Sequence, residues 1–131
     1  MEFITIKDKR DIEKFLNKTN AMHDGHIISV QYSNCGISKE GGGYLYDPQK
    51  TKLNVKILIT SIYDAVVELE FEHLLEWQIK DNFCGSYIFE ASAAFNEQGF
   101  VVWTDDILFD INDIKGCSYA IAESMKWRIV E

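Results

Sequence analysis

The chain has few of the residues that mark secreted or membrane proteins. Its 131 residues include one proline, Pro48, and three cysteines, at the distant positions 35, 84 and 117. An odd number of widely spaced cysteines fits neither a disulfide framework nor a Cys-x-x-Cys metal site, whereas free thiols fit a reducing compartment. No apolar run approaches the roughly 20 residues that span a bilayer, and the first residues lack the layout of a secretion signal. We therefore expect a soluble, cytoplasmic protein with no membrane association.

Positive charge is also scarce. Thirteen Lys and Arg residues stand against 21 Asp and Glu residues, which gives a formal net charge of −8. Such a chain repels phosphate backbones, so we expect no nucleic-acid partner. The same excess of carboxylates favours a basic protein as the partner.

Motifs of common catalytic sites are missing as well. The chain has no Gly-x-Ser-x-Gly segment, and no histidine lies near a cysteine in the sequence. The glycine run 41–43 is not followed by Lys-Ser/Thr and a helix, so it predicts a flexible loop rather than a phosphate site. We expect neither a cofactor nor a metal ion.

Apolar residues, in contrast, make up 47% of the chain, which is typical of an ordered globular protein. The length fits a single domain over residues 1–131. Ile12, Phe15 and Leu16 recur at the spacing of one buried helix face, and Asp8 is placed to cap the first turn of that helix. After residues 18–20 weaken the helix, Gly25 provides the permissive backbone for a turn.

From residue 28 onward the hydrophobic period changes from about 3.6 to 2, which predicts strands with one buried face. Ile28, Val30 and Tyr32 form the expected buried face of the first of them, and Tyr87 and Phe89 begin that of a later one. The predicted strands cover residues 3–6, 28–33, 53–60, 65–79 with a bulge near residues 73–74, 87–95, 100–103 and 121–129. Residues 120–125 also have helical propensity, so a helix stays open there.

Turn residues separate these strands at short intervals. Turns are predicted at residues 63–64, 80–85 and 96–99, a loop or loose hairpin at residues 35–48, and an irregular segment at residues 107–117. Short connections between sequential strands make antiparallel pairs. We predict an α+β fold with an N-terminal helix packed on a curved, mostly antiparallel sheet that forms a half-barrel, and a β-sandwich is the alternative.

The first candidate site is His23-Asp24 with His26, at the junction between the helix and the first long strand. Imidazoles beside a carboxylate suit metal binding or proton transfer. On a strand, however, His23 and His26 would point to opposite faces, so both could act together only if the chain turns at Gly25. The competing interpretation is structural, with Asp24 capping backbone amides and His23 packing locally.

The second candidate is the row Glu68, Glu70 and Glu72 on one face of a strand, with about 7 Å between successive members. Such a row can meet an arginine-rich partner, although it is usually a solvated face. The third is Asp105-Asp106, which follows Trp103-Thr104 and is joined by Glu90 from a neighbouring strand. Paired carboxylates beside an aromatic ring suit a glycosidase or a metal-dependent hydrolase, although adjacent aspartates at a strand end are more often turn residues.

A resemblance adds to these patterns. The segment Met22-His23-Asp24-Gly25-His26-Ile27 and the closing Met125-Lys126-Trp127-Arg128-Ile129-Val130 resemble a set of small bacterial proteins of uncharacterised function. These begin with a His-Asp-x-x-Ile signature and end on a Lys-Trp-Arg strand. Some small acidic proteins of this general kind resemble immunity proteins, which neutralise a cognate toxin in the cytoplasm. The resemblance implies that His23, Asp24 and Trp127 are a joint structural signature, and it carries no catalytic residue.

Two hypotheses of function follow. The first is a non-enzymatic protein-binding module of immunity-protein type, whose partner is a basic protein such as a toxin. The second is a small metal-dependent or carboxylate hydrolase that uses residues from the set His23, Asp24, His26, Glu90, Asp105 and Asp106. The sequence favours the first, and it leaves the oligomeric state open.

Overall fold

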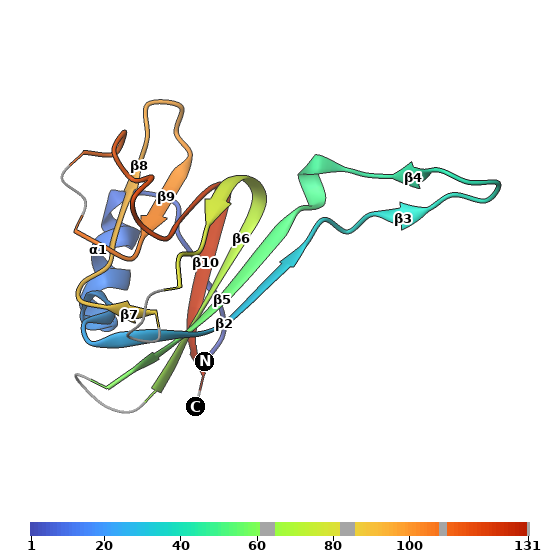
Figure 1. Ribbon diagram of the computed structural model, residues 1–131. Coiled ribbons are helices and arrows are strands. Elements are labelled where there is room, and N and C mark those ends of the chain that lie inside the picture. Colours follow the sequence, from blue (N-terminus) through green and yellow to red (C-terminus); the bar gives the residue numbers. More distant parts are fainter. Residues whose placement is uncertain (61–64, 82–85, 108–109, 131) are drawn as a thin grey trace.

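The fold is a strongly curled antiparallel sheet with one helix packed against its inner face (Figure 1). The computed structural model describes residues 1–60, 65–81, 86–107 and 110–130. The main sheet runs in the order β7-β2-β5-β6-β10-β9-β8, and β1 (Ile4–Thr5) pairs with β10. Its other strands are β2 (Gly25–Ser33), β5 (Lys52–Ile59), β6 (Ala65–Gln78), β7 (Tyr87–Ile88), β8 (Ser92–Phe95), β9 (Val101–Thr104) and β10 (Tyr119–Val130). The predicted α+β class and half-barrel are confirmed.

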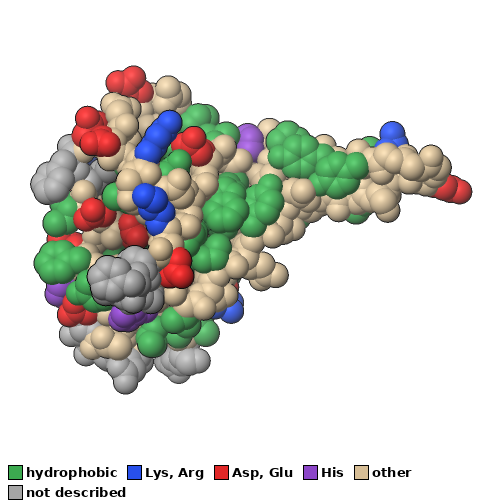
Figure 2. Space-filling model, in the orientation of Figure 1, with side chains coloured by type: hydrophobic (Ala, Val, Ile, Leu, Met, Phe, Trp, Pro, Cys, Tyr) green, Lys and Arg blue, Asp and Glu red, His purple; other side chains and the backbone are tan. Residues whose placement is uncertain are grey.

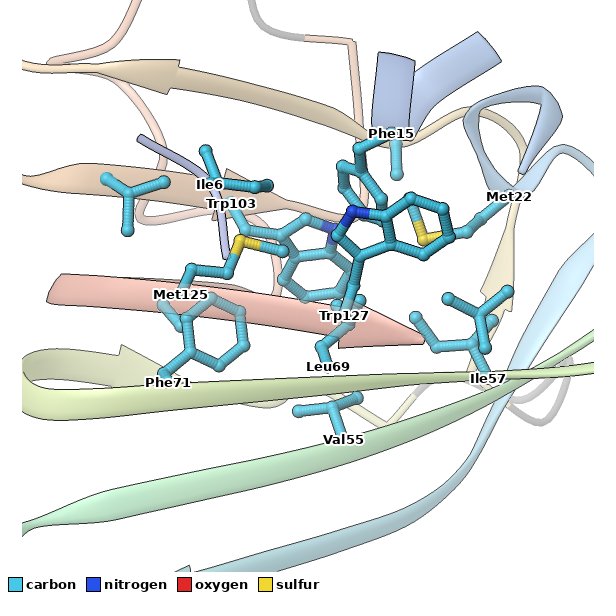
Figure 3. Close-up of a cluster of buried hydrophobic side chains, with 14 of the residues drawn as sticks. Ile6, Phe15, Met22, Val55, Ile57, Leu69, Phe71, Trp103, Met125 and Trp127 are labelled. Atoms are coloured by element: carbon cyan, nitrogen blue, oxygen red, sulfur yellow. The ribbon is translucent and has the colours of Figure 1, made fainter. Parts of the chain in front are cut away.

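The helix α1 (Lys9–Lys18) begins where the sequence predicted it. The Asp8 side chain accepts a hydrogen bond of 2.9 Å from the Asp11 amide, which caps the first turn. Ile12 and Phe15 are buried, and the Phe15 ring lies 5.2 Å from the Trp127 ring of β10 (Figure 3). This contact fixes the helix against the middle of the sheet.

The centre of the core lies over the neighbouring strands β5, β6 and β10. In their register Val55 is opposite Leu69 and Leu69 is opposite Trp127, so one apolar row crosses all three strands. Each of these side chains is at most 2% exposed, and Figure 3 shows them stacked in the interior. The strict alternation of β5 and β6 produced this row, as predicted.

A bulge bends β6, also as predicted. His73 has a left-handed φ of 50°, and the register with β10 shifts between Ile121 and Ala122. Ala122 and Met125 are both fully buried although they are three residues apart, so the alternation of β10 changes between them, at the level of His73 in β6. The helical alternative for residues 120–125 is wrong, because this segment is part of β10.

The single strand predicted over residues 87–95 is two strands at opposite ends of the sheet. β7 pairs with β2, and β8 pairs with β9. Between them the Ala91 amide donates to the Ala21 carbonyl at 2.8 Å, so the chain crosses the helix end instead of continuing a ladder. Its predicted faces are therefore wrong at β7, where Ile88 is fully buried and Phe89 is 57% exposed.

The structural reason for glycine at position 25 differs from the predicted one. The turn before it is made by non-glycine residues with positive φ, namely Asn20, Ala21, Met22 and Asp24. Gly25 itself belongs to β2, where a Cβ would lie 2.7 Å from the Met22 carbonyl oxygen and 3.3 Å from that of Leu58. Close approach of neighbouring backbones, rather than a turn conformation, therefore requires glycine here.

β2 lies at an edge for most of its length, and its predicted buried face is wrong. Ile28, Val30 and Tyr32 are 53%, 37% and 45% exposed. β5 covers one side of the strand, but on the other side β7 pairs only with Gly25 and His26. The alternating pattern therefore predicted the strand correctly. It did not predict the exposure of these side chains, which depends on neighbours distant in the sequence.

Between β2 and β5 the chain forms a projecting hairpin, which we call the arm (residues 34–51; Figure 1). It contains β3 (Ile37–Ser38) paired with β4 (Tyr44–Leu45), the glycine turn 41–43, and the 3-10 helix η2 (Pro48–Lys50). The loose hairpin predicted for residues 35–48 is confirmed. The predicted turn at residues 63–64 lies outside the described residues, as does most of the one at 80–85.

The hairpin turn predicted at residues 96–99 is confirmed, with Gly99 at a φ of 82°. A second 3-10 helix, η1 (Asn20–Met22), follows α1. No helix among the described residues is long and apolar enough to cross a membrane.

Candidate functional site

A cleft of about 630 Å³ opens between the end of β9, the start of β10 and the segment around β7. Its described lining residues are Lys80, Asp81, Tyr87, Phe89, Asp105, Asp106, Gly116, Cys117 and Ser118. We call it the acidic cleft, because its described lining includes three aspartates and one lysine. It contains Asp105 and Asp106 from the third predicted constellation.

Ser118 holds the floor of the acidic cleft together. Its side chain is fully buried, and its Oγ accepts a hydrogen bond from the Lys80 amide at 2.8 Å. Its own amide donates to Asp105 Oδ1 at 3.0 Å, and its carbonyl accepts from the Asp105 amide at 3.0 Å. The ends of β6, β9 and β10 are thereby fixed to one another, and Asp105 is held in place.

The two aspartates have different environments although they are adjacent. Burial raises the pKa of Asp105, the two hydrogen bonds from Ser118 oppose this shift, and the neighbouring charge of Asp106 adds to it. Asp106 is exposed at the rim, where Oδ1 accepts from the Ile107 amide at 2.7 Å. The pair therefore presents one carboxylate that is costly to ionise and one that is open to solvent.

The thiol of Cys117 is poorly suited to nucleophilic chemistry. Burial raises its pKa above the ordinary value of 9.0, and the charges of Asp106 and Asp105 raise it further. The thiol donates to Asp106 Oδ2 across 3.7 Å. Since a reactive cysteine needs a lowered pKa, this thiol stays protonated at neutral pH.

The His23-Asp24 turn supports the wall of the acidic cleft that Tyr87 and Phe89 form. The Tyr87 hydroxyl donates to Asp24 Oδ1, and His23 Nδ1 bonds the Phe89 carbonyl. Because a carbonyl only accepts, His23 Nδ1 must carry the proton in this bond. The His23 and Phe89 rings also meet edge to face, with centroids 5.2 Å apart.

These contacts give the turn a structural role at the cleft. His23 and Asp24 are used to hold Phe89 and Tyr87, as the structural interpretation anticipated, and His26 packs its ring 5.4 Å from that of Tyr87. None of the three lines the cleft itself. Two of the predicted constellations therefore meet at one place, with different roles.

Two members of the third constellation lie elsewhere. Trp103 is fully buried, with its ring 6.3 Å from that of Phe71, so it cannot serve as a platform for a ligand. Glu90 lines a separate hollow of about 420 Å³ beside α1. Exposed Phe89 supplies the aromatic surface of the cleft instead.

The glutamate row lies on the outer face of the sheet and is paired with two basic side chains of β10. Glu68 is only 7% exposed and accepts bonds of 2.7 Å from both Arg128 and Asn54. Lys126 bridges Glu70 and Glu72 at 3.1 and 3.0 Å. The basic residues of β10 lie in register with this row, with Lys126 opposite Glu70 and Arg128 opposite Glu68.

Among the described residues, no three His, Cys, Asp or Glu side chains are grouped so that they could hold a metal ion. The metal-dependent form of the hydrolase hypothesis therefore has no support from the described geometry. Comparison with known proteins adds no assignment. No family model, no curated protein and no solved structure matches this chain.

Sequence reasoning did not find Tyr87, Phe89 or Ser118 as parts of the site. The alternation of residues 87–95 placed Phe89 in the core, and an isolated serine has no signal of its own. A chain crossing between two sheet edges moves side chains to faces that local periodicity cannot predict. Asp105 and Asp106 could be predicted as a pair only because they follow one another in the sequence.

Proposed function

We propose that this protein is a non-enzymatic protein-binding module of immunity-protein type, and that it recognises a basic protein such as a toxin through the acidic cleft. The observation that carries the proposal is the described lining of the cleft, which combines Asp81, Asp105 and Asp106 with one lysine and an exposed phenylalanine. A carboxylate group beside an aromatic face is suited to an arginine or lysine side chain.

The electrostatics of the chain support this partner. With the glutamate row paired to Lys126 and Arg128, much of the remaining negative charge lies away from that face of the sheet. Figure 2 shows acidic side chains spread over the visible face of the body, with basic ones among them. An incoming guanidinium would also offset the cost of ionising the half-buried Asp105.

The test uses a small probe, the arginine tripeptide acetyl-Gly-Arg-Gly-amide, titrated by calorimetry or NMR at low salt. We expect weak, salt-sensitive binding that Asp105→Asn with Asp106→Asn weakens about tenfold or more, because charged hydrogen bonds are lost. The control is Glu2→Gln with Glu97→Gln, which removes the same charge from exposed positions outside the cleft. Equal weakening by both pairs would overturn the proposal, since only net charge would then matter.

A second candidate function rests on Asp105 as well. Burial raises the pKa of the Asp105 carboxyl, and the Asp106 carboxyl stands next to it at the rim of the cleft. In such a pair one group can act as general acid and the other as base. This favours the carboxylate form of the hydrolase hypothesis. Turnover of glycoside or ester substrates that disappears in Asp105→Asn would establish it and would displace the binding proposal.

A further inference from the structure

Lys80 is the positively charged residue in the described lining of the acidic cleft, and its main chain is held there. Its amide donates to the Ser118 hydroxyl at 2.8 Å, and that hydroxyl donates in turn to the Lys80 carbonyl at 3.4 Å. Because Ser118 is fully buried, these bonds fix Lys80 to the floor of the cleft. The position of Lys80 therefore depends on its main chain and not on its ammonium group.

The ammonium group of Lys80 makes no ion pair within the described part of the chain. None of the ion pairs of 4.0 Å or less between described residues includes it, although Asp81, Asp105 and Asp106 line the same cleft. Each of these aspartates accepts a hydrogen bond from another group. The cleft thus presents a positive group that is separate from its negative ones.

The cleft is also larger than one side chain requires. Pockets that hold whole small molecules have volumes of roughly 300–1,000 Å³. The acidic cleft, with about 630 Å³, falls in this range. The Phe89 ring, which is 57% exposed, adds an apolar surface to the same space. A complete residue of a partner, with its backbone and terminal groups, therefore has room in the cleft.

Lys80 restricts the kind of basic ligand that suits this space. A guanidinium that enters among the aspartates also approaches the lysine, and like charges repel. A ligand that carries its own carboxylate beside the basic side chain removes this repulsion, because the carboxylate pairs with the ammonium group. A carboxyl-terminal arginine has both groups on one residue, and no further chain has to be accommodated after it.

We propose that the acidic cleft recognises the carboxyl-terminal arginine of the basic partner, with the guanidinium at Asp105 and Asp106 and the terminal carboxylate on Lys80. This inference rests on the proposed function, because it specifies which residue of that partner the cleft takes. Capture of a terminal carboxylate is a recurring mode of peptide recognition. The two aspartates then select for the basic side chain, and Lys80 selects for the end of a chain.

The experiment compares two peptides that differ only in their terminal group, namely acetyl-Gly-Gly-Arg with a free carboxylate and the same peptide with a terminal amide. Each is titrated into the protein at low salt and followed by backbone NMR shifts. We expect the wild type to bind the free-carboxylate peptide about fivefold more tightly or better, because it adds a charged pair. We expect Lys80→Gln to bind both peptides equally, and the amidated one at least as tightly as the wild type does, because the repelling cation is gone.

The matched control is Lys14→Gln, which removes the same charge from an exposed position of α1 outside the cleft. This variant should keep the preference for the free carboxylate. Lys80→Gln should fold as the wild type does, because the bonds between Lys80 and Ser118 use only main-chain atoms of the lysine.

Equal binding of the two peptides by the wild type, or a preference that persists in Lys80→Gln, would overturn this inference. Tighter binding of free L-arginine than of the free-carboxylate peptide would also overturn it, since the ligand would then be an amino acid rather than a chain end. The proposed function fails separately, if Asp105→Asn with Asp106→Asn binds the amidated peptide as the wild type does. No detectable binding of either peptide would overturn both.

Discussion

At the scale of single residues, the three glutamates of β6 differ in what they contribute. Glu68 is nearly buried between Arg128 and Asn54, whereas Glu72 shares Lys126 with Glu70 at a more open position. Exposed ion pairs contribute little, and a hydrogen-bonded charge that is mostly buried contributes more. The same residue type in one regular row therefore has different energetic roles.

We predict that Glu68→Gln lowers the free energy of unfolding at pH 7 by about 1–3 kcal/mol, and Glu72→Gln by about 0–1 kcal/mol. Burial alone would raise the pKa of Glu68, but the bonds from Asn54 and Arg128 outweigh it and lower the pKa below 4.5. Its contribution is thus complete above pH 4.5 and is lost as the pH falls through the lower folded-state pKa. Urea unfolding at several pH values measures this, and a Glu68→Gln deficit that persists in strong acid would contradict it.

The pKa of Asp105 is shifted in the opposite direction to that of Glu68. Because its folded-state pKa is raised, the protonated form is favoured on folding, and this contribution is present below about pH 3.8 and lost as the pH rises through the folded pKa. The Asp105→Asn variant keeps a side-chain oxygen that accepts from the Ser118 amide, and its side chain cannot ionise. We therefore expect the variant to be at least as stable as the wild type at pH 7. Thermal unfolding at pH 4 and pH 7 checks this, and a variant clearly less stable at pH 7 would contradict it.

At the scale of elements, the junction between η1 and β2 depends on one close backbone approach. Gly25→Ala would place a Cβ 2.7 Å from a backbone oxygen and 3.0 Å from the Ile57 side chain. We expect it to lower the free energy of unfolding by about 1–3 kcal/mol. Gly116→Ala is the control, because a Cβ added there would meet no atom within 4 Å, and we expect a change within about 0.5 kcal/mol. Equal effects in denaturant unfolding would show that close approach is not the reason for Gly25.

The sequence predicted elements well where one face of an element is covered along its whole length. α1, β5, β6 with its bulge, and the hairpin at residues 96–99 were all found, because periodicity, capping and turn residues act locally. It failed at β2 and β7, which lie at the sheet edge, because exposure there depends on neighbours distant in sequence. The candidate site follows the same rule. Asp105 and Asp106 are neighbours in the sequence and could be predicted, whereas Phe89 lines the cleft only because the chain crosses from β7 to β8.

At the scale of the whole molecule, two surfaces of different character lie on one curled sheet. The acidic cleft is charged, lies at the ends of β9 and β10, and is proposed to take a basic side chain. The β2 edge and the arm expose apolar side chains, among them Tyr32, Ile37 and Tyr44. Because the acidic cleft would bind its partner through charge, salt should weaken binding there.

The measurement that tests the proposed function most directly is an amide NMR map of the chain as acetyl-Gly-Arg-Gly-amide is added. We predict that the shifts concentrate at Phe89, Asp105, Asp106, Cys117 and Ser118 and disappear in Asp105→Asn with Asp106→Asn. Shifts centred on Glu70 and Glu72 beside Lys126, or spread evenly over the acidic residues, would contradict the account.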